Sequence, residues 1–407
     1  MPGARARRDA GGPSARVGLA LAGGGPEGAI YEIGALCALE DAVEGLDLNA
    51  LRVYVGVSAG AFIAACLANQ LTAAQMARAI VKSEPGEHPF VPHTFLTPAL
   101  RELARRGARL PRLFAEAMWA YDRHPRDHTL GEALTRLGRA LPVGVFDNEP
   151  IRAYLEQIYT IKGRSDDFRR LRRKLVIVAA DLESGQAVRF GEGRFAQVPI
   201  SRAVQASSAL PGLYPPVEVD GRHYVDGVLL KTLHTSVALQ AGARLVLCIN
   251  PIVPVDMVRA VSEGSYRNGH LVERGLPTVL SQTFRTLIHS RLEAGFATYE
   301  RRYRGADVVL LEPPRDDYEM FFTNIFRFSA RRAVADHAYR STRRELRRRA
   351  VELGPVFARH GLRLRREALA HDGAGLWPRL GLPPAGGVRE ILGDLERTLD
   401  RLEELVG

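Results

Sequence analysis

Cysteine is scarce in this sequence, and long apolar runs are absent from it. The 407-residue chain has three cysteines, Cys37, Cys66 and Cys248, and none of them forms a CxxC pair or a Cys/His metal spacing. We therefore expect no bound metal, and we interpret the cysteines as core residues of a protein in a reducing compartment, the cytoplasm. No apolar run approaches the ~20 residues that a membrane-spanning helix needs.

Acidic residues are in short supply at the two ends of the chain, although the middle is nearly neutral. The net charge is +10, of which residues 1–16 carry +3 and residues 331–407 carry +5. Basic ends can make peripheral contact with an anionic membrane, but arginines on helices are commonly just solvated. Both interpretations stay open, and we expect no nucleic-acid partner.

Five short apolar segments predict buried strands. They are apolar nearly throughout, which is typical of a parallel sheet that is covered on both faces. Helical patterns lie between them, as in IYEIGALCALEDAV after the first segment and AGAFIAACLANQL after the second. We therefore predict a three-layer α/β/α fold with a mainly parallel central sheet. The five segments are 17–22, 53–57, 175–180, 245–249 and 308–311.

The chain divides by composition into four parts. Residues 1–16 are rich in Gly, Pro and Arg and predict a disordered basic tail. The main domain is expected over 17–330, and its Pro- and His-containing segment 85–145 is expected to be an insertion or lid. Residues 331–407 predict a helical C-terminal extension, which ends in an amphipathic stripe of leucines and isoleucine.

The stretch GVSAG places Ser58 between a predicted strand and a predicted helix. Small residues at Gly56 and Gly60 allow the sharp turn and close packing that expose a nucleophilic serine. The helix that begins at Ala59 directs free N–H groups and the positive end of its dipole at the same place. The alternative is a glycine-flanked turn whose serine merely caps a helix.

A second glycine-rich turn, at Gly23, Gly24, Gly25 and Gly28, follows the first predicted strand. It matches GxGxxG, the pattern of a dinucleotide-binding loop, but no acidic residue follows at the end of a second strand to hold a ribose. The alternative is an oxyanion hole, because unhindered glycine N–H groups can stabilise a tetrahedral intermediate. Loops at the carboxyl edge of a parallel sheet lie side by side, so this loop can meet Ser58.

The candidate general base is Asp226, which with Gly227 follows the short strand-like segment HYV. A buried carboxylate beside a serine can take its proton, although an Asp-Gly pair is also an ordinary turn. His223 and His234 lie close in sequence and make a Ser-His-Asp triad conceivable. We rank His234 as the better triad candidate of the two, but below a Ser-Asp dyad.

These motifs together resemble the patatin-like phospholipase family. The likeness covers roughly residues 17–344 and includes the flanking segments IGALCALEDA and AVQASSALPGLYPPVEVDGRHYVDG. The resemblance implies a dyad in which Ser58 attacks an ester carbonyl and Asp226 serves as base. It further implies an oxyanion hole at Gly23, Gly24, Gly25 and Ala59, with no cofactor.

Two positions depart from the family pattern. Glu27, preceded by Pro26, stands where the family usually has Arg or Lys, so the preference for an anionic head group is in question. Val228 follows Asp226-Gly227 where Gly or Ala is expected, and its side chain would either crowd the dyad or pack into the core. Neither change removes a catalytic atom.

The resemblance implies a lipid acyl hydrolase of the phospholipase A or lysophospholipase type, acting on a lipid ester. The alternatives are an esterase or thioesterase for another acyl donor, and a catalytically silent lipid-binding protein. The aromatic segment 318–328 is expected to line the acyl pocket or the core, with insertion into a membrane surface as the second interpretation. The sequence leaves the oligomeric state open.

Overall fold

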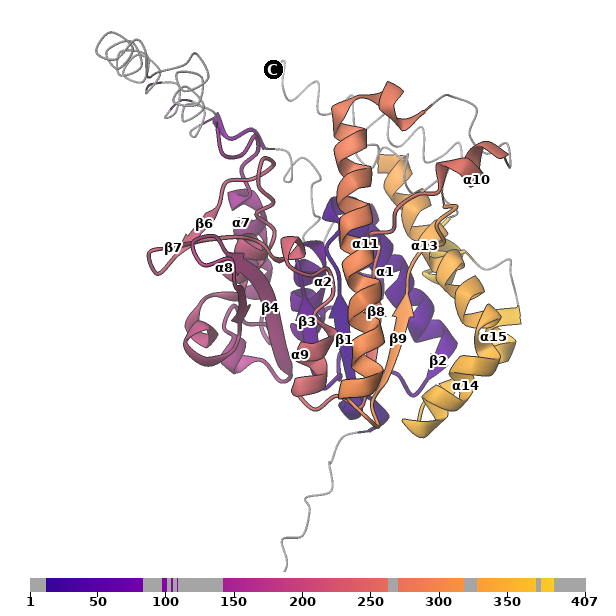
Figure 1. Ribbon diagram of the computed structural model, residues 1–407. Coiled ribbons are helices and arrows are strands. Elements are labelled where there is room, and N and C mark those ends of the chain that lie inside the picture. The colour runs from indigo at the N-terminus through magenta and orange to yellow at the C-terminus, as the bar shows by residue number, and fades with distance from the viewer. Residues whose placement is uncertain are drawn as a thin grey trace, which may run out of the picture.

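The computed structural model describes residues 12–82, 97–100, 104, 108, 142–262, 270–317, 328–370 and 375–383. Their centre is an eight-stranded sheet in the order β6-β7-β4-β3-β1-β8-β9, with β5 paired to β4 (Figure 1). The strands are β1 (Val17–Leu21), β3 (Val53–Gly56), β4 (Lys174–Asp181), β5 (Ala187–Phe190), β6 (Val217–Val219), β7 (Arg222–Asp226), β8 (Leu245–Ile249) and β9 (Asp307–Leu311).

The sheet is parallel from β4 to β9 and antiparallel around its other end. The pairs β3/β4, β1/β3, β1/β8 and β8/β9 are parallel. The pairs β4/β5, β4/β7 and β6/β7 are antiparallel. Every residue of β1, β3 and β8 is buried, which explains why these strands read as unbroken apolar runs. The predicted mainly parallel α/β fold is confirmed.

Helices cover both faces of the sheet, and the strands contribute alternate residues to two cores. Leu19 and Leu21 belong to the core under α1, α2, α8 and α13, whereas Ala20 and Ala22 belong to the core under α9 and α11. The helices are α1 (Gly25–Ala42), α2 (Ala59–Ala68), α3 (Ala73–Met76), α7 (Glu149–Tyr159), α8 (Ile200–Ser207), α9 (Thr235–Gln240), α10 (Met257–Ser262), α11 (Leu276–Arg302), α13 (Phe328–Arg348), α14 (Ala350–Arg359), α15 (Arg366–Ala370) and α16 (Leu376–Arg379).

The C-terminal helices are part of the main core. Helix α13 packs along α1 so closely that a Cβ atom at Gly34 would lie 2.3 Å from the carbonyl oxygen of Ala335. Tyr339 and Trp377 are buried in the same core as β1. In addition, β10 (Arg363–Leu364) pairs antiparallel with β2 (Val43–Glu44), directly after α1. The predicted helical C-terminal region is therefore present and contributes a layer to the α/β domain.

Many arginines of this C-terminal region hold the domain together. Arg359 pairs with Asp307, the first residue of β9, and Arg379 pairs with Asp41 near the end of α1. The guanidinium of Arg332 lies 4.7 Å from the centroid of a ring of the buried Trp377. Arginines used in this way are not available to a membrane, which favours the structural interpretation of the basic composition of residues 331–383.

The structure changes one boundary and leaves several expectations untested. Pro13–Arg16 forms a short 3-10 helix in which Ser14 is buried and bonds Gly45, so order begins before residue 17. This stretch packs because the Ser14 hydroxyl donates to a carbonyl oxygen and accepts from the N–H of Asp47. Cys37, Cys66 and Cys248 are buried and free, as predicted. Residues 1–11, the aromatic segment 318–327, the terminal stripe and most of 85–145 lie outside the described residues.

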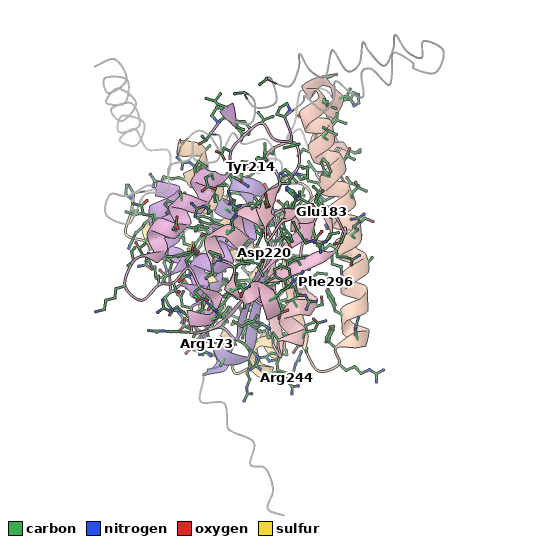
Figure 2. All side chains as sticks on the ribbon, turned by 90° about the vertical axis from the view of Figure 1, so that its left-hand side faces the viewer. Arg173, Glu183, Tyr214, Asp220, Arg244 and Phe296 are labelled. Atoms are coloured by element: carbon green, nitrogen blue, oxygen red, sulfur yellow. The ribbon has the colours of Figure 1, made fainter. Side chains whose placement is uncertain are left out.

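The two ends of the sheet differ in what they carry. Arg173 and Arg244 directly precede β4 and β8 and lie at one end of the molecule, whereas Tyr214 lies at the other (Figure 2). The loops that contain Ser58 and the glycines leave β3 and β1 at this second end, the carboxyl edge of the parallel strands. This edge is where ligands bind in open α/β sheets.

Candidate functional site

Ser58 stands at a strained corner between β3 and α2. Its backbone has φ 54° and ψ −123°, a conformation that residues other than glycine rarely adopt. Such strain costs on the order of 1–3 kcal/mol and persists only where the surroundings enforce it. A Cβ at Gly56 would lie 2.4 Å from the carbonyl oxygen of Gly60, and one at Gly60 would lie 2.4 Å from that of Ala22. The two glycines of GVSAG therefore let the corner pack against itself and against β1.

A second serine, Ser207, fastens this corner to the sheet. Its hydroxyl accepts a hydrogen bond from the backbone N–H of Ser58 at 2.9 Å and donates one to the carbonyl oxygen of Val178 at 2.6 Å. Ser207 is the last residue of α8 and is completely buried. This role was not predicted, because the two serines are 149 positions apart and no local spacing connects them.

The glycine loop lies directly beside the corner. Gly24 and Gly25 have positive φ values of 156° and 60°, and a Cβ at Gly24 would lie 2.8 Å from atoms of Gly28 and Pro251. A Cβ at Gly23 would lie 3.2 Å from the Cβ of Ser58. By contrast, a Cβ at Gly25 would meet nothing within 4 Å, so Gly25 borders open space.

Four backbone N–H groups around Ser58 have no acceptor within the described part of the chain. They belong to Gly23, Gly24, Gly25 and Ala59. Gly24, Gly25 and Ala59 line the same pocket as Ser58, whereas Gly23 does not. Ala59 is the first residue of α2 and Gly25 is the first of α1, so two helix N-termini converge on the serine. Such N–H groups can bind a negatively charged oxygen.

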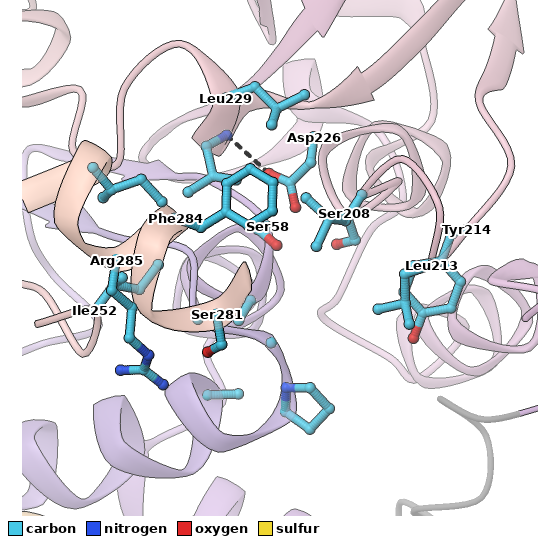
Figure 3. Close-up of a pocket in the computed structure, with 18 of the residues that line it drawn as sticks. Ser58, Ser208, Leu213, Tyr214, Asp226, Leu229, Ile252, Ser281, Phe284 and Arg285 are labelled. Atoms are coloured by element: carbon cyan, nitrogen blue, oxygen red, sulfur yellow. Dashed lines mark hydrogen bonds between the residues drawn. The ribbon is translucent and has the colours of Figure 1, made fainter. Parts of the chain in front are cut away.

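The strand register brings Asp226 level with Ser58. Gly56 pairs with Ile177 across β3/β4, so Ser58 reaches the level of Ala179 two residues later. Ala179 in turn pairs with Asp226 on β7, on the opposite side of β4. The two predicted catalytic residues therefore emerge at the same height, and Figure 3 shows their side chains facing one another.

Burial controls the protonation of Asp226. Its side chain is nearly inaccessible, and this desolvation raises the pKa of the carboxyl group to about 7. The nearby Ser58 hydroxyl and the backbone N–H of Val228, which donates to Asp226 at 2.9 Å, act in the opposite direction. A carboxyl group with a pKa near neutrality can both accept and return a proton.

Val228 packs into the core without separating Asp226 from Ser58. Its side chain belongs to the core under α9 and α11, and its Cγ2 lies 3.1 Å from where a Cβ of Gly23 would be. The branched side chain thus packs against the glycine loop, while its N–H orients Asp226. Of the two possibilities raised by the sequence, packing is the one observed.

Neither histidine near Asp226 lies in the pocket. His223 is exposed and contacts Glu183 at 2.9 Å. His234 is buried at the start of α9, where desolvation lowers its pKa to about 3, and it does not line the pocket. This arrangement favours the Ser-Asp pair over a triad.

The pocket beside Ser58 has a volume of about 660 Å³, within the usual range for small-molecule sites. Its wall is mostly apolar and comes from α1, α2, α7, the loop after α8, and α11 (Figure 3). Asp226, Arg285 and Arg291 are its charged lining residues in the described part of the chain. The contributing apolar side chains include Phe62, Ile151, Leu210, Leu213, Leu280, Phe284, Leu287 and Ile288.

The contribution of α11 could not be read from the sequence. This helix spans 27 residues, and its packing across the pocket from α1 is a tertiary contact that no local pattern encodes. It brings Arg285 to within 3.9 Å of Glu27 in the first turn of α1. The acidic residue that departs from the family pattern therefore has a cationic neighbour from 258 positions later in the chain.

A sequence profile described as Patatin-like phospholipase matches residues 19–239, which is more than half of the chain. The match contains the glycine loop, Ser58 and Asp226, and it ends before β8.

Solved structures similar to this chain include bacterial and human proteins. VipD from Legionella pneumophila is 14% identical, with a TM-score of 0.35, over 81% of this chain and 66% of its own. The type III effector ExoU of Pseudomonas aeruginosa is 17% identical, with a TM-score of 0.33, over 83% of this chain and 53% of its own. Human GIVD cytosolic phospholipase A2 is 14% identical, with a TM-score of 0.26, over 62% and 43%. The chain therefore matches less than two thirds of the length of each.

Proposed function

Because this chain belongs to the patatin-like phospholipase family, we propose that it is a serine lipid acyl hydrolase of the phospholipase A or lysophospholipase type. The observation that carries the proposal is the pairing of Ser58 with Asp226 in the wall of an apolar pocket. The N–H groups of Gly24, Gly25 and Ala59, which have no acceptor among the described residues, lie in the same wall.

The geometry supports a two-step mechanism. The Oγ atom of Ser58 attacks the ester carbonyl carbon while Asp226 takes the hydroxyl proton. The N–H groups of Gly24, Gly25 and Ala59 stabilise the negative oxygen of the tetrahedral intermediate. Collapse expels the alcohol, which takes the proton back from Asp226 and leaves an acyl group on Ser58. Water then attacks the acyl-enzyme with Asp226 again as base, and the fatty acid leaves.

The substrate class can be identified directly. We would incubate the protein with phospholipids, lysophospholipids, glycerides and acyl-CoAs, and measure released acids by mass spectrometry. Protein with Ser58→Ala provides the background. Release from the oxygen esters alone supports the proposal, whereas preferential release from acyl-CoA supports a thioesterase. Equal background release from both folded proteins would support the catalytically silent alternative.

The rate of hydrolysis is expected to rise with pH and to level off above about pH 7. Asp226 must be ionised to accept the proton, and its pKa is raised to about 7. We therefore expect kcat/KM for a soluble short-chain ester to fall about tenfold per pH unit below that value. A constant kcat/KM from about pH 5 to pH 8, in protein that stays folded, would contradict a base with this raised pKa.

We propose that the protein meets its substrate at a lipid surface through an apolar rim. None of the helices in the described part of the chain combines the length and hydrophobicity needed to cross a membrane. However, seven of the twelve large hydrophobic side chains exposed in that part lie between residues 258 and 287. On α11, the residues Leu276, Leu280, Phe284 and Leu287 follow helical spacing, and the last three also line the pocket.

Charging this rim outside the pocket is expected to weaken vesicle binding. Val272 and Leu276 are exposed and do not line the pocket, so Val272→Asp with Leu276→Asp should leave the pocket intact. We expect about a tenfold or greater loss of partitioning onto phosphatidylcholine vesicles in a flotation assay. The matched control is Leu182→Asp with Val351→Asp, which charges two exposed apolar residues elsewhere. Equal loss in both double variants would argue against this rim.

A further inference from the structure

A charged pair lies at one end of the mostly apolar pocket. Arg285 of α11 lines the pocket, and its Nη2 atom is 3.9 Å from Oε2 of Glu27. Both side chains are largely buried, with exposed fractions of 18% and 17%. Figure 3 shows Arg285 reaching from α11 toward α1, on the far side of Ser281 from Tyr214.

This pair is poorly matched for its surroundings. Good Arg–carboxylate pairs have N–O distances of about 2.7–2.9 Å and often two parallel hydrogen bonds. Here the separation is 3.9 Å, and Oε1 of Glu27 is buried with no hydrogen-bond partner in the part of the chain that the structure describes. The guanidinium also donates a long 3.4 Å hydrogen bond to the carbonyl oxygen of Val253. An anion of better geometry could therefore replace Glu27 beside Arg285.

The surroundings favour an anion at this place. Glu27 lies in the first turn of α1, an 18-residue helix whose N-terminus carries partial positive charge. Asp317, which pairs with His337, also faces Glu27 and disfavours its ionised form. Burial, the largest cause, and this second carboxylate raise the pKa of Glu27 to about 7 against the opposing effect of Arg285, so Glu27 is only partly ionised near neutrality.

We propose that Arg285 is a specificity-determining residue that binds the phosphate of a phosphate-bearing lipid substrate, and that this phosphate displaces Glu27. The inference rests on the proposed hydrolase function. In this arrangement the positive charge comes from α11. Glu27 balances the charge of Arg285 when no substrate is bound. Lipids without phosphate bind to the same pocket without this exchange.

The test compares two substrates that share a palmitoyl ester. Palmitoyl-lysophosphatidylcholine carries a phosphate, and monopalmitoylglycerol does not. We expect Arg285→Gln to lower kcat/KM for the lysophospholipid by about 30-fold or more, because it removes a desolvated charge contact. The effect on the glycerol ester should stay within about threefold. Arg285→Lys should restore part of the loss, since it keeps the charge but lacks the planar fork.

Two more variants sharpen the comparison. Glu27→Gln removes the competing carboxylate and should raise kcat/KM for the lysophospholipid severalfold, with little change for the glycerol ester. Arg291→Gln is the matched arginine control, because Arg291 also lines the pocket but is exposed and donates to the carbonyl oxygen of Leu229. It should change both substrates by the same factor.

Three outcomes would overturn the inference. Equal losses on both substrates in Arg285→Gln would assign the residue a positioning role, and no loss on either would assign it none. If the wild-type protein hydrolyses neither lipid, the proposed function fails, and calorimetric binding to the wild type decides the inference separately. Binding of the lysophospholipid that Arg285→Gln does not weaken would then overturn it as well.

Discussion

Protein with Ser58→Ala is expected to lose at least about 10⁴-fold in kcat/KM for every ester that the wild type hydrolyses. Removing the nucleophile leaves only the pocket and the oxyanion-stabilising N–H groups, which cannot form an acyl-enzyme. The hydroxyl of Ser58 does not hold the corner in place, because the hydrogen bond that does so comes from the backbone N–H of Ser58. The variant should therefore fold, with an unchanged circular dichroism spectrum.

Covalent labelling tests whether Ser58 is the nucleophile without requiring the substrate to be known. A fluorophosphonate should label the tryptic peptide from Val53 to Arg78, in which Ser58 is the only serine. Ser58→Ala should abolish that label, whereas Ser208→Ala, which changes a neighbouring serine of the pocket wall, should still be labelled on the same peptide. Labelling that persists in Ser58→Ala would identify a different nucleophile.

Replacing Asp226 with asparagine is expected to stop catalysis and to stabilise the fold above neutral pH. Loss of the general base should lower kcat/KM by about 10³–10⁴-fold. Asparagine keeps an oxygen for the N–H of Val228 but has no charge to bury. Activity above one tenth of the wild type would show that Asp226 is not the base.

The stability effect follows from the direction of the pKa shift. The pKa of Asp226 is raised in the folded state, from 3.8 to about 7. The folded protein therefore loses stability as pH rises from about 4 to 7, at up to about 1.4 kcal/mol per unit. Asp226→Asn escapes this loss, so its melting temperature should exceed that of the wild type at pH 8 but not at pH 4.

Asp181 provides a control, because its pKa is shifted in the opposite direction to that of Asp226. It lies at the end of β4, where it pairs with Arg222 and accepts hydrogen bonds from the N–H groups of Glu183 and Ser184. Its pKa is lowered, with Ser184 and Arg222 among the groups that favour the charged form. Asp181→Asn should therefore destabilise the fold at pH 7 while leaving the specific activity of the folded protein unchanged. If both variants lost activity in proportion to their stability, Asp226 would have no separate chemical role.

Local sequence patterns predicted the parts of the site that depend on backbone shape. Ser58 and the glycine loop follow strands whose residues are buried on both faces, and such strands produce unmistakable apolar runs. The small antiparallel strands β5 and β6 gave no comparable signal, because they are short and partly exposed. Their pairing nevertheless completes the sheet around β4, the strand that sets Asp226 level with Ser58.

Contacts between distant segments were beyond prediction. Ser207 holds Ser58 across 149 positions of sequence, and Arg285 reaches Glu27 across a longer span still. Neither contact has a period or spacing that a single sequence displays. Glu27 is an example, because no spacing within the loop indicates the cation that lies near its carboxylate.

The contact between α1 and α13 affects which part of this chain can be moved into another protein. Helix α1 begins at the glycine loop, and at Gly34 its backbone touches that of α13. The position of the glycine loop relative to Ser58 thus depends on residues about 300 positions downstream. These residues lie well past residue 239, where the matched segment ends. A graft of residues 19–239 would carry Ser58 and Asp226 but would lack α13, the helix that packs against α1.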